Sequence, residues 1–440
     1  MATVAPQSLV TADQAPTDQT PTTRARRAFP WIVFTLTFAL LLSDYMSRQV
    51  LSAVFPFLKA EWALSDTQLG ALTSVVALTV GLLAVPLSLL GDRWGRVRAI
   101  VLMACVWSLA TVASAVAANY GQLLAARLFI GVGEAAYGSV GLAVVLAVFP
   151  AYRRAALTGT FMAGGSFGSV LGVALGGALA VHFGWRWALG AMAVLGFVIV
   201  VLFRLLISDE KLDRHRAAGA LSGVPRPTRK RAPLSTLVST RAVLCAYLGS
   251  GCQLFVAGTL LSWLPSYFNR AYHLAPGKAA GLASIGILLL ALGMIGCGAL
   301  TDRLSRYVPL RKWTTAIVYS TASLVFLGLG FSVRPGGLGL LLIAVGCFFS
   351  AGSAGPAGAM VANLTAESLR ATALGTLTLA NNLLGLAAGP FVIGLLADRM
   401  GLSGALRIMP LIAVAAIVFF LVGRRAYPAG IRRISASEAA

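Results

Sequence analysis

The chain has 440 residues, of which 58% are hydrophobic and only 11% are charged, whereas soluble domains carry about 25% charged residues. Its mean hydropathy of +0.84 excludes an ordinary soluble domain and indicates a membrane protein. The 35 Lys and Arg residues outnumber the 14 Asp and Glu residues, and the net charge of +21 indicates a nucleic-acid partner only if membrane topology does not explain it.

The first 28 residues are rich in Thr, Ala, Gln and Pro and end in three arginines, a composition that does not bury a core. We therefore expect a disordered cytoplasmic tail at 1–28. A secretory signal is not indicated, because the apolar run after Pro30 is longer than the roughly 7–15 residues of a signal and lacks an Ala-x-Ala exit. This run is expected to remain in the membrane as the first helix.

Twelve stretches are long enough to cross a bilayer, since a spanning helix needs about 20 mostly apolar residues. They are residues 30–58, 66–90, 99–118, 122–148, 155–181, 187–207, 242–268, 279–300, 313–332, 337–362, 370–397 and 404–423. The sequence thus predicts an all-α membrane protein with two six-helix bundles, at 29–207 and 241–423. A basic, proline-containing stretch at 208–240 is expected to be a cytoplasmic linker, and 424–440 a cytoplasmic tail.

The basic residues concentrate on one side of this topology. With the N-terminus inside, 25 Lys and Arg residues fall on the inner side, 7 on the outer side and 3 in or at the edge of the membrane. The positive-inside rule accounts for this bias, so the charge needs no nucleic acid, and both termini are predicted to be cytoplasmic.

The cysteines and histidines form no pattern typical of a metal site or a disulfide framework. All five cysteines lie in apolar stretches without a CxxC pair, and there are only three histidines. We therefore expect no metal and no cofactor.

Short motifs recur in the two halves. The run that begins at Arg154 (Arg-Ala-Ala-Leu-Thr-Gly-Thr) matches the run that begins at Arg370 (Arg-Ala-Thr-Ala-Leu-Gly-Thr), 216 residues later. The loop at 91–96 likewise matches the loop at 301–306, 210 residues later. Two such halves related by an axis normal to the membrane, with a central cavity, are typical of secondary transporters.

With these motifs the sequence resembles the major facilitator superfamily over nearly its whole length. The loop at 91–98 is similar to the signature between helices 2 and 3, Arg127-x-x-x-Gly131 to the helix 4 motif, and the glycines between 164 and 177 to the glycine-rich helix 5 motif. The run at 131–137 (Gly-Val-Gly-Glu-Ala-Ala-Tyr) is similar to that of Spinster-like transporters, whose animal members export sphingosine phosphate and lysophospholipids. The resemblance implies alternating access, a lipid-like substrate and a bacterial inner membrane.

Helix 1 departs from the Spinster-like pattern Asn-Tyr-x-Asp-Arg, which stands here as Asp44-Tyr-Met-Ser47-Arg48. Asp44 and Glu134 are the only acids deep within the predicted spans. An ionised group at mid-membrane costs roughly 2.5–3.5 kcal/mol on insertion scales, so such a residue usually faces a cavity or a partner. Asp44 and Arg48 share one face of helix 1, and Arg127 and Glu134 share one face of helix 4, so we expect a polar cluster.

We predict that Glu134 and Asp44 exchange the coupled proton, because arrival of substrate changes the balance between burial and the neighbouring arginines. Arg48 and Arg127 are predicted to contact the substrate. The alternative is a set of static ion pairs that joins helices 1 and 4, in which Arg127 positions helix 4. The other predicted substrate contacts are Tyr45, Tyr137, Gln253, Phe255, Trp263, Phe348, Asn381 and Asn382.

Tyr267 is a further cavity candidate on the same predicted helix as Trp263. Because both lie near a helix end, a position in an interfacial aromatic belt is the alternative to a cavity contact.

Charged residues of the loops are predicted to form a gate. Asp92 is expected to cap the start of helix 11 near 368–371, and Asp302 the start of helix 5, because carboxylates bind the unpaired amides of a helix N-terminus. These contacts would close the inner side while the outer side is open; tight turns with solvated charges are the alternative. The accompanying gate residues are Arg93, Arg96, Arg154, Arg303 and Arg370.

The sequence thus predicts a monomeric, proton-coupled secondary transporter of a small or amphipathic organic solute, such as a lysolipid-like or hydrophobic compound. An organic-anion symporter that uses Arg48 and Arg127 and an uncoupled facilitator remain alternatives. An enzyme is not indicated, because the spans hold no Gly-x-Ser-x-Gly or metal-ligand motif, and a primary pump would need a nucleotide-binding loop. A channel or sensor would not need duplicate loop signatures.

Overall fold

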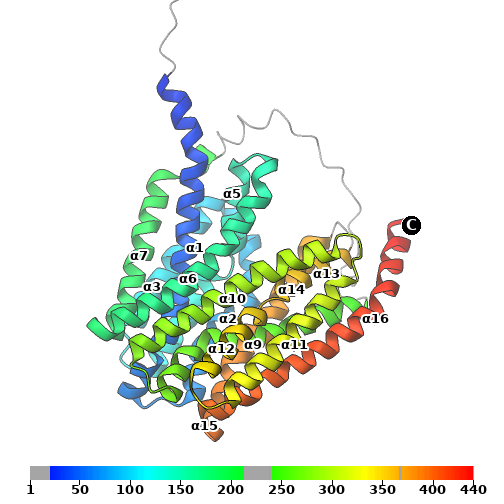
Figure 1. Ribbon diagram of the computed structural model, residues 1–440. Helices are drawn as coiled ribbons and strands as arrows, with labels where there is room; N and C mark the ends of the chain where they lie inside the picture. The colour runs from blue at the N-terminus through cyan, green and yellow to red at the C-terminus, as the bar shows by residue number, and fades with distance from the viewer. Residues whose placement is uncertain (1–19, 213–236, 238–239, 366–368, 440) are drawn as a thin grey trace, which may run out of the picture.

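The computed structural model describes residues 20–212, 237, 240–365 and 369–439, and this part of the chain is helical throughout its regular structure (Figure 1). The first half contains α1 (Thr20–Trp62), α2 (Asp66–Trp94), α3 (Arg96–Ala115), α4 (Tyr120–Glu134), α5 (Tyr137–Val148), the 3₁₀ turn η1 (Ala151–Arg153), α6 (Arg154–Phe183) and α7 (Trp185–Leu206). The second half contains α9 (Arg241–Ala271), α10 (Pro276–Ser305), α11 (Arg311–Ser332), α12 (Gly337–Ser350), α13 (Ala354–Asn363), α14 (Arg370–Ala380), the π-helix η4 (Asn381–Ala387), α15 (Ala388–Ile408), the 3₁₀ turn η5 (Met409–Leu411) and α16 (Ile412–Ala439).

Eleven helical segments of the described residues are long and apolar enough to span a membrane. The last of them, Thr372–Arg433, is 62 residues long, about twice the length of the others. It is interrupted at Gly401, whose φ of 79° lies in the left-handed region that glycine adopts without strain. The interruption divides it into two spans, which agrees with the twelve that the sequence predicts.

Two spans are broken near their middle, where the sequence predicted single helices over 122–148 and 337–362. α4 ends at Glu134 and α5 begins at Tyr137, and α12 ends at Ser350 and α13 begins at Ala354. The first break carries no stop signal, because only Ala135 and Ala136 form its turn. The second has Gly352 and Ser353 in its turn and Pro356 just after it, but the stretch remains apolar throughout and was predicted as one span. Glu134 and Ser350 are 216 residues apart, the same offset that relates Arg154 to Arg370, so the break belongs to the repeat.

Polar side chains cap several of the helices. Ser65 and Gln68 form a reciprocal capping box at the start of α2, with N–O distances of 3.1 and 3.0 Å. The Thr240 hydroxyl accepts a hydrogen bond from Val243 N at the start of α9. α1, in contrast, begins at Thr20, so the last part of the predicted tail 1–28 is helical.

The two halves meet at one end of the molecule. In Figure 1, α1 and α16 extend toward the same end, which we call the termini end; the opposite end is the far end. At the far end α2 packs against α15 and α6 against α10. Here a Cβ at Gly177 would overlap Ala280, and a Cβ at Gly70 would overlap the Pro390 carbonyl, so the backbones of the two halves are in close contact.

The hydrophobic cores follow the same division. One cluster of buried residues belongs to the first half and another to the second, but the largest contains residues of both. In it, the rings of Phe55 (α1) and Trp263 (α9) lie with centroids 5.4 Å apart. At the termini end, Arg93, Asp302 and Arg370 are exposed, and no hydrogen bond or ion pair of the described residues joins them to the opposite half. Among the described residues, the hydrogen bonds and ion pairs that join the two halves therefore lie at the far end.

Candidate functional site

The structure brings charged side chains of α1 and α4 together in the middle of the spans. Arg48 Nε lies 3.9 Å from Glu134 Oε2, and Asp44, one turn earlier on α1, interacts electrostatically with both. Asp44 and Glu134 are each only 6% exposed. We call Asp44, Arg48 and Glu134 the acid–arginine cluster.

Close packing of α1 against α6 sets the direction of these side chains. A Cβ at Gly168 would lie 2.6 Å from the Leu42 carbonyl oxygen, and a Cβ at Gly172 would lie 2.7 Å from that of Met46, so only glycine allows this approach. The Tyr45 ring covers Gly165 on the same side of α1. Asp44 and Arg48 consequently project from the other side, toward α4.

Several polar atoms of the acid–arginine cluster are buried without a hydrogen-bond partner among the described residues. They are Asp44 Oδ1, Arg48 Nη2 and both carboxyl oxygens of Glu134. Most buried polar groups in proteins are paired, so a group of unpaired ones indicates a place where water, a proton or a ligand binds.

Arg127 is buried differently, although it lies on the same face of α4. Its Nε, Nη1 and Nη2 atoms donate to the carbonyl oxygens of Leu72, Ser47 and Arg48 at 3.4, 3.3 and 3.0 Å. The side chain is fully buried. It therefore joins α4 to the backbones of α1 and α2. This geometry fits the alternative in which Arg127 positions helix 4 and does not contact the substrate.

Tyr137 lies just beyond the break in helix 4 and is also committed to packing. Its hydroxyl donates to the Thr37 carbonyl oxygen at 2.6 Å, and its ring contacts Trp107 edge to face, with centroids 5.0 Å apart. The two contacts hold the start of α5 against α1 and α3. Glu134 is thus positioned between Arg127 and Tyr137, each anchored to a neighbouring helix.

The second half has a neutral contact at the corresponding place. Gln253 Nε2 of α9 donates to the Ser350 carbonyl oxygen at 2.9 Å, at the break that corresponds to Glu134. Gln253 is fully buried, and its Oε1 atom has no partner among the described residues. The helix pair that carries charges in the first half is therefore joined by an amide in the second.

The predicted aromatic contacts lie in different surroundings. Trp263 is fully buried and donates from Nε1 to the Pro390 carbonyl oxygen at 3.1 Å within the second half, while its ring contacts Phe55 of the first half. Phe255 is buried in the same core, and Tyr267 is 2% exposed. The alternative of an interfacial belt for Trp263 and Tyr267 is wrong, because neither side chain reaches the surface. Phe348 is half-buried, and its backbone passes directly over Gly293 of α10.

Asn381 and Asn382 begin the π-helix η4, which faces α2 across the two halves. Asn382 Nδ2 donates to the Thr378 carbonyl oxygen at 2.9 Å, and its Cβ lies against Gly81 of α2. Asn381 Oδ1 is buried without a partner among the described residues. Because π-helical turns are frequent at functional sites, this segment is the second half's strongest candidate for a solute contact.

An ionic contact at the far end was not predicted from the sequence. Arg270 forms a two-pronged ion pair with Asp66, with distances of 2.8 and 2.7 Å, and Lys59 Nζ lies 2.6 Å from Asp66 Oδ1. Asp398 accepts hydrogen bonds from the backbone amides of Asp66 and Thr67 at 2.7 and 2.9 Å. We call Lys59, Asp66, Arg270 and Asp398 the far-end latch, because it joins the start of α2 to α9 and α15.

Two sequence signals pointed to this latch. Ser65-x-x-Gln68 is a capping box that marks the start of α2, and Asp398-Arg399 repeats the Asp-Arg pair of 92–93 and 302–303. The predicted gate residues lie at the termini end. Arg303 and Arg154 are exposed there, and Arg96 begins α3. The Asp92 side chain and residues 366–368 lie outside the described part, so the predicted cap of helix 11 stays a prediction. Asp302 is exposed and makes no described contact with the start of helix 5, so that cap, which belongs to a state closed at the termini end, also stays a prediction.

Comparison with known proteins identifies the family. The family model of the Major Facilitator Superfamily matches residues 37–355. The chain belongs to this superfamily. It is similar to the Protein spinster of Drosophila melanogaster, with 26% identity over 65% of this chain and 47% of that protein. It is also similar to the Hexuronate transporter of Bacillus subtilis, with 23% identity over 88% of this chain and 93% of that protein, and to the Probable L-galactonate transporter of Escherichia coli, with 29% identity over 64% and 63%.

The fold also matches solved structures. A bacterial homolog of the human lysosomal transporter Spinster, described as inward-facing and unoccupied, superposes with a TM-score of 0.77 at 18% identity, over 91% of this chain and 98% of that chain. The chain therefore has the same fold as this transporter. The chain spans less than two thirds of the Drosophila and Escherichia coli relatives, but most of the Bacillus one. Its relatives indicate a multi-pass membrane transporter of a small-molecule substrate rather than an enzyme.

Proposed function

We propose that this Spinster-like transporter moves a small or amphipathic organic solute by proton-coupled alternating access. The observation that carries the proposal is the acid–arginine cluster, because ionisable groups inside a membrane are rare and usually belong to a transport or proton pathway. Two carboxyl groups share this cluster with a single guanidinium, since backbone carbonyls hold that of Arg127. With both acids ionised, the acid–arginine cluster carries one net negative charge, which the nearby charge of Arg127 partly offsets. A proton on either acid, or a solute that contacts Arg48, changes that balance.

The arrangement of the halves supports alternating access. The far-end latch and the Phe55–Trp263 contact join the halves at one end, while the charged residues of the termini end are exposed. The basic residues at 93–98, 153–154 and 424–433 all lie toward the termini end, so by the positive-inside rule we propose that this end faces the cytoplasm. The structure then corresponds to a cytoplasm-open state of a protein that works as a monomer.

The substrate is proposed to be amphipathic, because the charges of the first half face a second half without mid-span charges. The contacts on that side come from groups such as Phe255 and Asn381. An organic anion is the second candidate. It is favoured by the unpaired Arg48 Nη2 atom, which suits a carboxylate, and by the likeness to hexuronate and galactonate transporters.

Transport by purified protein in liposomes with an imposed pH gradient tests this function. Candidate solutes are first selected by thermal shift from lysophospholipids, hydrophobic cations and sugar acids, because a ligand that binds only the folded protein stabilises it. We expect one of these classes to accumulate against its gradient, and a proton ionophore to abolish the accumulation. If the rate and final level of solute uptake do not depend on the pH gradient, the protein would instead be an uncoupled facilitator.

A further inference from the structure

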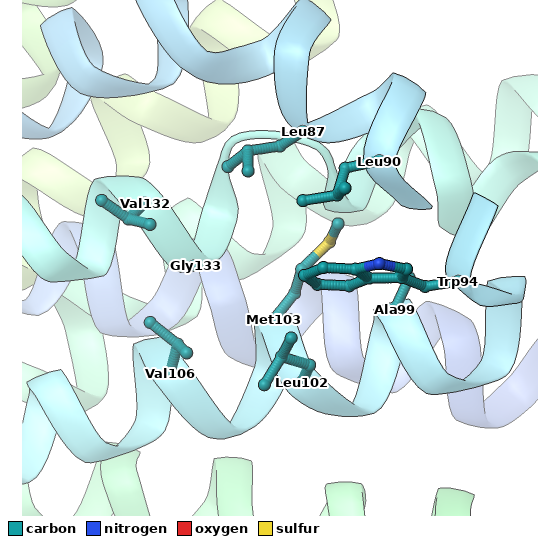
Figure 2. A pocket seen from close by; sticks show the side chains of 9 residues that line it. All are labelled: Leu87, Leu90, Trp94, Ala99, Leu102, Met103, Val106, Val132 and Gly133. Carbon is teal, nitrogen blue, oxygen red and sulfur yellow. The ribbon is translucent and has the colours of Figure 1, made fainter. Parts of the chain in front are cut away.

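An apolar pocket lies between α2, α3 and α4, apart from the acid–arginine cluster. It is a partly open pocket with a cavity volume of about 80 Å³. Figure 2 shows the side chains of α2 and α3 facing each other across it, with Val132 and Gly133 at the end away from Trp94. Its lining residues are Leu87, Leu90, Trp94, Ala99, Leu102, Met103, Val106, Val132 and Gly133. None of the described side chains that line the pocket is charged.

The pocket opens on the surface that faces the bilayer. Leu102 and Trp94, which line it, are 49% and 52% exposed. Along α3 the exposed apolar side chains recur at Leu102, Leu109 and Val116, seven residues apart, and so form one continuous stripe. In a membrane such a stripe contacts lipid. An occupant of the pocket therefore enters from the acyl-chain region.

Positive charge flanks the mouth of the pocket at the termini end. Arg93 precedes Trp94, and Arg98 lies one helical turn before Leu102 on the same face of α3. Both arginines are exposed, and neither forms an ion pair with a described residue. Tryptophan and arginine at this depth lie at the level of lipid headgroups. The surface thus combines an apolar slot with charges complementary to a lipid phosphate.

We propose that this pocket binds one acyl chain of an anionic phospholipid, with the lipid phosphate on Arg93 and Arg98. Basic pockets beside spanning helices are known to select anionic headgroups, and an apolar slot supplies the burial that a headgroup site alone lacks. Gly133, which lines the pocket, directly precedes Glu134 at the break in helix 4. The lipid therefore contacts the segment that positions Glu134, and its presence raises the transport rate; this last effect rests on the proposed function, whereas binding does not.

Native mass spectrometry of the delipidated, full-length transporter tests the binding. The protein is titrated with phosphatidylglycerol and with phosphatidylcholine of the same acyl chains, and phosphatidylglycerol is expected to bind more tightly. Arg98→Gln should weaken its binding about fivefold, which corresponds to about 1 kcal/mol per basic residue near an anionic surface. Leu102→Trp should fill the slot and weaken binding of both lipids by about tenfold, because each displaced methylene is worth about fourfold.

Two matched variants serve as controls. Leu109→Trp adds the same ring on the lipid-facing stripe outside the pocket, and Arg204→Gln removes an exposed arginine from the last turn of α7; both should bind like the wild type. Equal affinity for the two lipids, unchanged binding to Leu102→Trp, or displacement of the lipid by glycerol 1-phosphate alone would overturn the proposal. Lipid binding is measured without any transport. A negative result for the lipid site is therefore distinguishable from a negative result for the proposed transport function.

Discussion

Charged side chains at one depth of the membrane have two distinct tasks, and their neighbours decide which. Three backbone carbonyls accept hydrogen bonds from Arg127, so its side chain is held in place in any state that keeps α1, α2 and α4 together. Arg48, Asp44 and Glu134 keep unpaired polar atoms and can respond to a proton or a solute. Buried groups that lack partners raise the energy of the resting protein, and they are retained where binding supplies the partner.

Glu134→Gln is expected to leave the fold intact, because the amide has the same shape and can still hydrogen-bond the Asp44 carboxyl group, while the contact that it weakens, with Arg48, is 3.9 Å long. The variant should lose pH-driven accumulation of solute while it still binds and exchanges it, since the amide does not exchange protons. Accumulation and counterflow in liposomes measure the two properties. Glu61→Gln, at the exposed ion pair with Arg186, is the control and should accumulate normally. Uphill transport by Glu134→Gln at the wild-type rate across pH would move the coupling site elsewhere.

Arg48→Ala is expected to weaken solute binding more than Arg127→Ala does. A hydrogen bond to a charged group is worth about 1.5–3 kcal/mol, so loss of Arg48 should raise the dissociation constant about ten- to a hundredfold. Arg48→Lys should keep only part of the solute affinity that Arg48→Ala loses, because an ammonium group lacks the planar two-pronged geometry of a guanidinium. Isothermal titration calorimetry measures the constants.

Arg127→Ala should instead lower the unfolding temperature, because it removes the hydrogen bonds by which a buried guanidinium joins α4 to α1 and α2, and a hydrogen bond to a charged group is worth about 1.5–3 kcal/mol. Equal dissociation constants for Arg48→Ala and Arg127→Ala would contradict the division of tasks.

The charged residues could be read from the sequence, but the division between them could not. Spacing shows that Arg127 and Glu134 share a face of helix 4, and scarcity of charge shows that they matter. Which group lies opposite depends on how α4 docks on α1 and α2, and carbonyl oxygens leave no trace in the sequence. The far-end latch was missed for a related reason, because Asp66 and Arg270 are 204 residues apart and join only when the halves close.

At the scale of helices, small residues decide how closely the spans approach and where they break. The turn at Ala135–Ala136 and the turn at Ala351–Ser353 occupy equivalent places in the two halves. Ala135 and Ala136 have no stop signal of their own, so packing rather than local preference determines the first break, whereas Gly352, Ser353 and Pro356 favour the second. The sequence therefore predicted the number of spans but not their interruption.

Gly172→Ala is expected to destabilise the transporter, because its Cβ would lie 2.7 Å from the Met46 carbonyl oxygen and would push α6 away from α1. Overpacking of this kind costs about 1–3 kcal/mol. Gly159→Ala, near the start of the same helix, has no atom within 4 Å of its Cβ and should be neutral or stabilising by up to about 1 kcal/mol. Thermal unfolding of the two variants in the same detergent gives the comparison. If both unfold at the same temperature, the close approach of α1 and α6 does not limit stability.

At the scale of the whole molecule, the far-end latch contains the interaction that the sequence predicted for the termini end, namely a carboxylate that caps a helix N-terminus. Asp398 lies in α15, near the end of the eleventh membrane span (370–397), and caps the start of α2. In the predicted gate, Asp92 at the end of α2 caps the start of the same span, which begins with α14. The two caps join the same pair of helices at opposite ends. When the halves rock about their axis, one cap must open as the other forms, so the two compete.

Neutralising the latch should favour the state that is open at the far end. A charge at a helix terminus is worth roughly 0.3–1 kcal/mol when exposed and up to ~2 when partly buried. Asp66→Asn and Asp398→Asn are therefore each expected to change the ratio of the two states by about two- to thirtyfold. A cysteine at Ala397, which is 4% exposed, reports the change through faster maleimide labelling in a background without the five native cysteines. Labelling that stays slow in both variants would show that apolar packing alone closes the far end.

Asp92→Asn and Asp302→Asn should shift the same ratio in the opposite direction, by about two- to thirtyfold, because they weaken the state that is closed at the termini end. A cysteine at Thr160, which is exposed at that end, should label faster while one at Ala397 labels more slowly. Asp209→Asn is the matched control: its carboxylate accepts a hydrogen bond from Val97 N within one half, so its loss leaves the ratio unchanged.

The competition between the two ends is tested most directly by combining Asp92→Asn with Asp66→Asn. The two sites lie at opposite ends of α2, and effects of distant, independent sites usually add. The double variant should therefore return toward the wild-type labelling ratio even though each single variant departs from it. If Asp92→Asn and Asp302→Asn leave labelling unchanged, the loops at 91–98 and 301–306 are turns with solvated charges, and closure of the termini end depends on other residues.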